Sequence, residues 1–249
     1  MSGHNRWTKI KRQKEAMGAS KGKLFTKLIK EITVSARLGG GDPAGNARLR
    51  AAVLAAREAN MPSDNITRAI KKGTGELEGA HYEEVTYEGY APGGVAVLVE
   101  CLTDNRHRTA GDVRANFSKG GGNLAAEGSV AWLFHRKGAI QVKHGPTEEQ
   151  VMEAALEAGA EDVVSLGADG FEVRTDPHGL HTVAAALEKA GLPVGEQRTV
   201  FLPQNTVRVE GDTARRVLRL LELLEDNDDV QNVWANYEMD DAVLAAAGA

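Results

Sequence analysis

The hydrophobic pattern of this chain changes its period near residue 80, and this change limits the folds that the chain can adopt. Before it, apolar residues such as Leu28 and Ile32 recur at helical spacing. After it, apolar residues such as Val95, Val97 and Val99 alternate along short runs. A helical segment followed by strands that alternate with helices predicts an α+β chain.

Three amphipathic helices are predicted before the change. The first covers residues 23–38 and ends at a run of glycines. The second opens with Asp42 as its N-cap and Pro43 at its first helical position. The third begins after Pro62 and ends at Gly73, and a glycine-containing polar linker follows it. Three helices of this length predict a small helical bundle.

Strand pairs that alternate with helices favour the ferredoxin-like arrangement. A complete βαββαβ unit is predicted from strands at 139–142, 162–166, 171–174 and 198–202 and helices at 147–158 and 180–190. The preceding segment supplies half of a second unit, with strands at 95–102 and 130–134 and a helix at 106–119. Its missing helix and strand are predicted at 213–224 and 230–237.

This pattern predicts one ferredoxin-like domain inserted in another. We expect a basic helical domain over residues 1–78, a ferredoxin-like domain over 79–136 and 205–240, and the inserted ferredoxin-like domain over 137–203. The fold class is therefore α+β, with an N-terminal three-helix bundle and two ferredoxin-like domains.

Charge is distributed unevenly along the chain. Residues 1–75 carry 16 Lys and Arg against 5 Asp and Glu, whereas residues 76–249 carry 14 against 30. The formal net charge is -5, so the basic segment stands out against an acidic remainder. Such a segment is suited to neutralise phosphates, and Trp7 among its charges is suited to stacking. The alternative is a solvated helix face without a partner.

A second basic segment lies at the start of the helix predicted at 106–119. Arg106 and Arg108 fall in its first turn, where positive charge opposes the helix dipole, so a ligand is one explanation for them. Ion pairs with Asp104, Asp112 or another acid of the chain are the alternative. The glycines at 120–122 suit close approach to a sugar-phosphate backbone, but a helix C-cap and turn is the simpler interpretation.

Candidate catalytic and metal-binding residues fit poorly with known motifs. The segment 18–23 lacks the glycine spacing of a phosphate loop. Asp176, His178 and His181 match no metal-ligand spacing and suit a helix cap and turn better. Cys101 is expected to be a small core residue, and Glu100 beside it requires a partner or an exposed sheet face. We expect no enzyme activity, no metal and no cofactor.

The chain contains no long apolar run. No stretch approaches the length of a membrane-spanning helix, and the first residues lack the apolar segment of a signal peptide. A single cysteine agrees with a reducing compartment. These features predict a soluble cytoplasmic protein without a membrane partner or small-molecule substrate.

Several motifs resemble those of the YebC family, which includes the mitochondrial translational activator of cytochrome c oxidase. They are Gly3-His4-Asn5-Arg6-Trp7, Tyr87-Glu88-Gly89-Tyr90, Thr103-Asp104-Asn105-Arg106 and Gly128-Ser129-Val130-Ala131-Trp132-Leu133-Phe134. The resemblance runs from residue 3 to about residue 240, with the motifs in the family's order. Asn5-Arg6 replaces the usual Ser-Lys, and Ala91 replaces the usual glycine.

The resemblance implies three domains and a protein without enzymatic activity. Family members are described as DNA-binding transcriptional regulators, and as translation factors that act on ribosomes stalled at proline runs. We favour ribosomal RNA or tRNA on the ribosome as the partner, because the helix around Arg48 and Arg50 lacks a clear helix-turn-helix pattern. Promoter DNA is the alternative, and a purely protein-binding scaffold is a third possibility.

The hypothesis that follows is a nucleic-acid interface with two contact points. The first is the part of the basic segment that ends at residue 30, and the second is the helix at 106–119. The candidate binding residues are His4, Arg6, Trp7, Lys9, Lys11, Arg12, Lys14, Lys21, Lys23, Lys27, Arg106, Arg108, Arg114 and Lys119.

Overall fold

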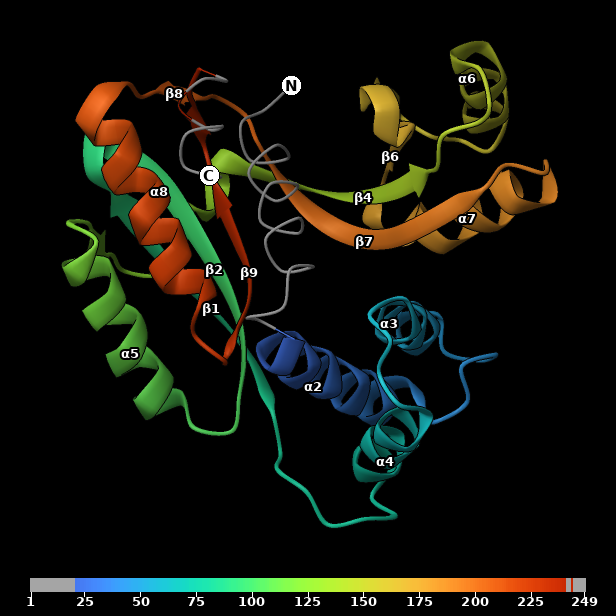
Figure 1. The fold of residues 1–249 in the computed structure, drawn as a ribbon, viewed down its shortest axis with the longest axis horizontal. Coiled ribbons are helices and arrows are strands. Elements are labelled where there is room, and N and C mark those ends of the chain that lie inside the picture. Colours follow the sequence, from blue (N-terminus) through green and yellow to red (C-terminus); the bar gives the residue numbers. More distant parts are fainter. Residues whose placement is uncertain (1–20, 241–242, 244–249) are drawn as a thin grey trace. The chain divides into compact units, whose positions relative to one another are not determined.

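A computed structural model describes residues 21–240 and residue 243. The described chain divides into two compact units, and each is considered by itself (Figure 1). The first contains residues 21–134 and the chain from residue 203 onward, and the second contains residues 135–202. Mixed helix and antiparallel sheet confirm the predicted α+β class.

Three helices open the first unit: α2 (Lys21–Gly39), α3 (Ala47–Glu58) and α4 (Ser63–Thr74). Their apolar faces meet in a core that includes Ile32, Leu49, Val53 and Ile66. Phe25 packs against this core, as its spacing in the first helix predicts. The three predicted helices are therefore confirmed, although two of their ends differ.

The second helix starts later than predicted. Asn46 is its N-cap and accepts a hydrogen bond from the Leu49 amide, so the prediction of Asp42 as the cap was wrong. The Asp42 carboxylate instead accepts from the Ala44 amide in a short turn. Asn46 also donates to the carbonyls of Ser35 and Gly40, which joins the start of α3 to the end of α2.

Gly73 lies inside α4 and does not end it. A Cβ at this position would lie 2.4 Å from the Thr33 carbonyl oxygen, so glycine allows α4 to approach α2 closely. The helix ends at Gly75, whose φ of 82° places it in the left-handed region that suits a glycine cap.

A four-stranded antiparallel sheet forms the rest of the first unit, in the order β3-β1-β2-β9. Its strands are β1 (Glu83–Ala91), β2 (Val95–Thr103), β3 (Asn123–Leu124) and β9 (Val230–Ala235). Helices α5 (Arg106–Lys119) and α8 (Gly211–Glu225) lie side by side over one face (Figure 1). Their apolar sides share a core with that face, including Val97, Val99, Phe117 and Val217.

Two elements of this unit differ from the sequence-based prediction. Strand β1 was not predicted, because Glu83, Glu84 and Glu88 interrupt its apolar pattern. The predicted strand at 130–134 was wrong: residues 131–133 form the short 3-10 helix η2, and Phe134 begins the strand β4. Strand β1 occupies the sheet position that a third strand would have in a ferredoxin-like order.

Smaller elements complete the first unit. The 3-10 helix η1 (Pro92–Gly94) connects β1 to β2, and the short strands β8 (Val207–Arg208) and β10 (Tyr237–Glu238) pair in parallel.

The second unit has the predicted βαββαβ order. Its elements are β4 (Phe134–Val142), α6 (Glu148–Glu157), β5 (Asp162–Ser165), η3 (Gly167–Asp169), β6 (Phe171–Thr175), η4 (Pro177–Gly179), α7 (Leu180–Lys189) and β7 (Val194–Pro203). The sheet order β5-β6-β4-β7 is the ferredoxin-like order. Thr147 caps α6, and its capping box with Gln150 fixes the start of this helix.

Candidate nucleic-acid interface

The predicted basic segment is described only from residue 21 onward. His4, Arg6, Trp7, Lys9, Lys11, Arg12 and Lys14 lie outside the described residues. Lys21, Lys23 and Lys27 lie on α2. Lys23 Nζ lies 3.2 Å from Asp226 Oδ1, and Lys27 Nζ donates to the Glu225 carbonyl at 2.7 Å. Two of these three lysines therefore contact the end of α8 in the same unit.

Lys30, one turn further along α2, is buried in an ion pair. Its Nζ lies 2.5 Å from Asp229 Oδ1 and also donates to the Asp228 carbonyl at 2.9 Å. The Tyr82 ring lies beside the ammonium group, with its centroid at 5.5 Å. Only 8% of the Lys30 side chain and 7% of the Asp229 side chain are exposed, so this lysine joins the helical bundle to the sheet.

Arg108 contacts the same carboxylate from α5. Its Nη2 lies 2.8 Å from Asp229 Oδ2 and 2.8 Å from Asp104 Oδ1, which confirms the alternative of ion pairing within the chain. Thr109 Oγ1 donates to Asp229 Oδ2 at 2.7 Å. Burial by itself would raise the pKa of Asp229, but the hydrogen bonds from Lys30, Arg108 and Thr109 lower it to about 2.

The other motif residues near this cluster also have local partners. Asn105 caps α5 and accepts from the Arg108 amide at 3.1 Å. Arg106 lies 3.8 Å from Glu83 in an exposed ion pair. These contacts give the segment from Thr103 to Thr109, which begins with the Thr103-Asp104-Asn105-Arg106 motif, a structural role at the junction of the sheet, α5 and α2.

A pocket of about 620 Å³ lies next to this cluster. Lys23, Lys30 and Arg108 line it together with five aspartates, among them Asp112 and Asp226. Acids thus outnumber bases in the lining, and a phosphate group there would meet net negative charge. The pocket is therefore poorly suited to bind a nucleic-acid backbone, although candidate binding residues line it.

Arg114 and Lys119 occupy a different environment. Both are exposed on α5, and neither has an ion pair within the described part of the chain. The glycines that follow them pack closely: a Cβ on Gly120 would lie 2.6 Å from the Leu220 side chain of α8. Gly120 is also the C-cap of α5, which confirms the simpler interpretation of this loop as a cap and turn.

The Glu88 carboxylate holds the loop at residues 128–131. It is 5% exposed and accepts hydrogen bonds from the amides of Gly128, Val130 and Ala131 at 2.7, 2.6 and 2.8 Å. Burial would raise the pKa of Glu88, but these amides lower it. Trp132 follows this loop with 65% of its surface exposed, and its indole nitrogen donates to the Ser129 carbonyl.

The other residues discussed from the sequence have structural contacts. Burial raises the pKa of the Cys101 thiol to about 12, which agrees with a core residue. Glu100 has partners: it accepts from the Trp234 indole at 2.8 Å and from Asn232 at 3.2 Å. Asp176 accepts from the His178 amide in the turn before α7, which confirms the cap and turn interpretation.

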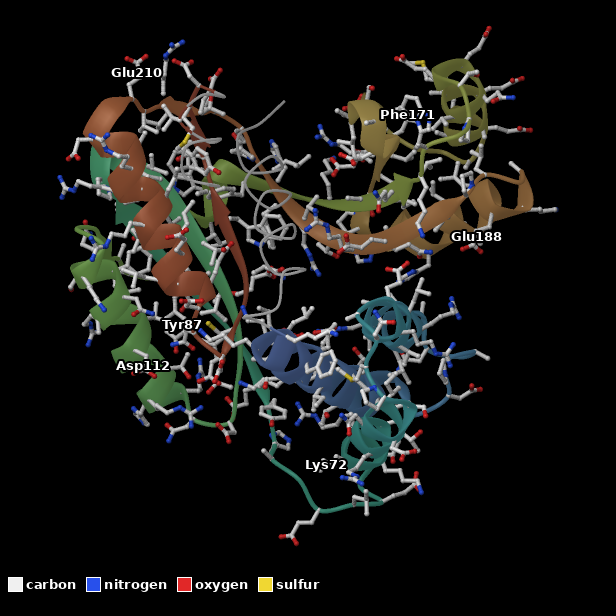
Figure 2. All side chains as sticks on the ribbon, viewed as in Figure 1. Lys72, Tyr87, Asp112, Phe171, Glu188 and Glu210 are labelled. Carbon is white, nitrogen blue, oxygen red and sulfur yellow. The ribbon has the colours of Figure 1, made fainter. Side chains whose placement is uncertain are left out.

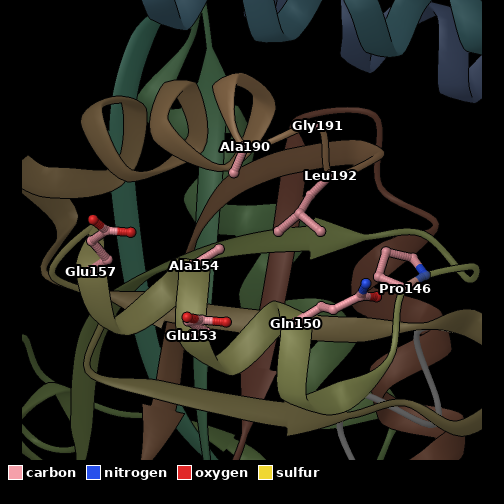
Figure 3. A pocket seen from close by; sticks show the side chains of 8 residues that line it. All are labelled: Pro146, Gln150, Glu153, Ala154, Glu157, Ala190, Gly191 and Leu192. Atoms are coloured by element: carbon pink, nitrogen blue, oxygen red, sulfur yellow. The ribbon is translucent and has the colours of Figure 1, made fainter.

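The second unit has a pocket of about 390 Å³ between α6 and the end of α7 (Figure 3). Glu153 and Glu157 lie on one side, and Leu192 lies on the other. Within residues 21–240, no group of three or more His, Cys, Asp or Glu side chains is placed to hold a metal ion. None of the helices in the described ranges is long and apolar enough to cross a membrane.

The sequence analysis did not identify the arginines of α8. Arg215, Arg216 and Arg219 are exposed on this helix. The signal was present in the sequence as basic residues at spacings of three and four in a strongly amphipathic helix. Conversely, Arg48 pairs with Glu31 and Glu84, and Arg50 donates to the Pro43 and Ala44 carbonyls, so these two arginines have partners within the chain.

The fold defines an α+β protein. Its first unit joins a helical bundle to an antiparallel sheet covered by α5 and α8, which carry exposed basic side chains, and its second unit is a ferredoxin-like domain. Residues 5–76 match the family described as TACO1/YebC protein N-terminal domain, and residues 82–237 match TACO1/YebC second and third domain. The chain belongs to the TACO1/YebC family.

Relatives cover almost the whole chain. A protein of Myxococcus xanthus is 68% identical over 98% of both chains, and one of Geobacter sulfurreducens is 56% identical over 96% of both. Both are named probable transcriptional regulatory proteins. The crystal structure of a conserved hypothetical protein from Aquifex aeolicus is 51% identical, with a TM-score of 0.82 over 90% of this chain and 93% of that one.

Proposed function

We propose that this protein is a non-enzymatic regulator of gene expression that binds ribosomal RNA or tRNA on the ribosome and relieves stalling at proline-rich stretches. The uneven charge is the observation that carries the binding part of this proposal. Residues 1–75 hold 16 bases against 5 acids within a chain of net charge -5. A polyanion is the partner that such a segment fits best. The action at proline runs rests on the resemblance to the family.

The described bases divide into two groups with different proposed roles. Lys23, Lys27 and Arg108 contact groups of their own chain, so we assign them to holding α2 and α5 in position. Lys21, Arg114 and Lys119 are exposed, and we assign them to phosphate contact together with the residues from His4 to Lys14. Arg106 also stays among the residues assigned to phosphate contact, because its ion pair with Glu83 is exposed and its charged atoms lie 3.8 Å apart.

Two observations favour structured RNA over a sequence-specific DNA site. Two arginines of α3 are held within the chain, Arg48 by Glu31 and Glu84 and Arg50 by backbone carbonyls, so these two are poorly placed to read bases. Helices α5 and α8 lie together over a sheet, and neither projects as a recognition helix (Figure 1). We therefore favour contact with the irregular phosphate surface of ribosomal RNA or tRNA. This places the protein in the cytoplasm, where ribosomes act.

Transcriptional regulation through DNA is the second candidate. The names of the Myxococcus and Geobacter relatives favour it. A regulator of this kind would bind its own promoter more tightly than random duplex by a factor of about 10³ or more.

Sedimentation with purified ribosomes tests the proposal. We expect the wild-type protein to pellet with ribosomes at physiological salt, and to restore translation of a reporter that contains a run of prolines. Failure to pellet would contradict ribosome binding. Pelleting without any effect on the reporter would contradict the role in stalling.

A competition titration tests the DNA alternative under the same salt. One promoter duplex competes with a random duplex of equal length, and we expect a specificity ratio near 1. A ratio of about 10³ would favour transcriptional regulation instead. Binding to ribosomal particles that survives nuclease treatment would favour a protein-binding scaffold.

A further inference from the structure

The exposed side of the layer formed by α5 and α8 carries four bases without acidic partners. They are Arg114 and Lys119 on α5, and Arg216 and Arg219 on α8. None of the four has an ion pair with any described residue. We call these four residues the α5–α8 basic face. Arg216 and Arg219 are not among the binding residues predicted from the sequence.

Close packing of the two helices places the end of α5 that carries Lys119 beside Arg216, while Arg114 lies further back along α5. Asn116 Nδ2 donates to the Leu223 carbonyl at 3.0 Å, and Gly120 meets Leu220. A Cβ on Gly121 would lie 2.5 Å from the Arg216 guanidinium. Later residues of α5 and its cap thus contact earlier residues of α8, so the two helices run antiparallel. The end of α5 that carries Lys119 lies alongside Arg216.

The arginines of α8 repel one another weakly, and a bound anion would relieve this repulsion. Arg219 lies three residues after Arg216 and four after Arg215, and like charges at these spacings repel each other on a helix. Arg215 has a partner in Asp212, with the two groups 3.7 Å apart. Arg216 and Arg219 have no such partner among the described residues, in contrast to Arg108 at the other end of α5, which contacts two aspartates.

The acids near this face have separate positions. Asp112 is exposed on α5 (Figure 2) and lines the acidic pocket near Asp229. Asp212 is paired with Arg215, and Glu222 lies one turn beyond Arg219 without an ion pair to it. Basic charge is therefore concentrated around Lys119, Arg216 and Arg219.

We propose that the α5–α8 basic face binds the phosphodiester backbone of an RNA double helix. Guanidinium groups bind phosphate oxygens in a bidentate manner, and neighbouring positions on a helix face suit successive phosphates. The residues at 120–122 are glycines, so no side chain holds a backbone away from this edge. Two helices packed side by side cannot enter a major groove, whereas A-form RNA is bound through its shape and backbone.

This inference rests on the proposed function and specifies a second contact on the same partner. The test measures fluorescence anisotropy of a labelled RNA hairpin with a stem of about 16 base pairs, the length that double-stranded RNA-binding domains span. The test variant is Arg216→Glu with Arg219→Glu. The matched control is Lys189→Glu with Arg136→Glu, which makes the same change in net charge at exposed positions outside the face that have no ion pair with any described residue.

We expect the test variant to raise the Kd for the hairpin about tenfold. The slope of log affinity against log salt concentration should become shallower by about 2, because two phosphate contacts are lost. The control should change both by much less. Equal Kd values and slopes for the two variants would overturn the inference. Tighter binding of a DNA duplex of the same sequence than of the RNA would also overturn it.

Ribosome sedimentation separates this inference from the proposed function. If the wild-type protein and the test variant pellet equally and bind the hairpin equally, the α5–α8 basic face is rejected and ribosome binding stands. If the wild-type protein binds neither hairpin nor ribosomes, both are rejected. The variant Arg216→Gln with Arg219→Gln removes the two positive charges without adding acids. A higher Kd for the hairpin with an unchanged thermal unfolding temperature would show that the lost affinity comes from lost RNA contacts and not from unfolding.

Discussion

Lys30 Nζ and Asp229 Oδ1 lie 2.5 Å apart in the interior of the first unit, with both side chains less than 10% exposed. Asp229 also accepts from Arg108 and Thr109, so one carboxylate joins α2, α5 and the start of β9. The adjacent residues Arg108 and Thr109 therefore both serve to hold this carboxylate. It also removes Arg108 from the group of bases available to a partner.

Replacing Lys30 by methionine should destabilise the protein strongly. The substitution leaves Asp229 buried without its closest partner, at a cost of about 3 to 5 kcal/mol in the free energy of unfolding. Urea denaturation measures this change. The matched control is Lys23→Met, which removes an exposed pair with Asp226 and should cost less than about 1 kcal/mol. Equal costs for the two variants would contradict the buried pair.

Acid should weaken the protein through Asp229. Because the folded state lowers the pKa of this carboxyl to about 2, its stabilisation is fully present above the ordinary value and is lost as pH falls from about 4 toward 2. The contribution is about 2 kcal/mol. Urea midpoints at pH 6 and pH 3 should differ less in Asp229→Asn than in the wild-type protein. An identical difference in both would show that Asp229 titrates normally.

Glu88 should stabilise the loop before Trp132. Glu88→Gln replaces a carboxylate that accepts three amide hydrogen bonds, so we expect a loss of about 1.5 to 3 kcal/mol. Hydrogen exchange at Gly128, Val130 and Ala131 should accelerate in the same variant. Glu127→Gln on the exposed neighbouring residue serves as control, with a change within about 0.5 kcal/mol. Unchanged exchange in Glu88→Gln would be inconsistent with this role.

Two glycines of the first unit should respond to alanine in opposite directions. A Cβ on Gly89 would lie 2.6 Å from the Asn123 carbonyl and from the Phe117 ring, so Gly89→Ala should cost about 1 to 3 kcal/mol. Gly111, in the middle of α5, has open space around it, and Gly111→Ala should add up to about 1 kcal/mol. Thermal unfolding distinguishes the two, and the same sign for both would contradict these packing contacts.

Periodic apolar residues predicted most of the fold. The helix at 106–119 agrees with the structure because Asn105 caps it and glycines follow it, and the βαββαβ order of the second unit agrees because its buried apolar residues recur at helical or strand spacing. Strand β1 escaped prediction because its glutamates serve distant partners, such as the loop amides that Glu88 binds. The apolar run at 130–134 was wrongly predicted as a strand. The amides of Val130 and Ala131 donate to the Glu88 carboxylate and not to a neighbouring strand.

The candidate site was harder to predict because charge alone does not distinguish a free base from a paired one. The partner of Lys30 and Arg108 is Asp229, more than a hundred residues away in sequence. The arginines of α8 join Arg114 and Lys119 only through the packing of α5 on α8. Whether a base is paired or exposed to a partner therefore depends on contacts between distant segments, which a local sequence pattern does not predict.

The salt dependence of ribosome binding tests the central claim most directly. The variant with Lys9, Lys11, Arg12 and Lys14 all changed to glutamate should bind ribosomes much more weakly than the wild-type protein. Its plot of log affinity against log salt concentration should be shallower by about 3 to 4, because the phosphate contacts of this segment are lost. Wild-type affinity and slope in this variant would contradict the claim that the basic segment binds a phosphodiester backbone.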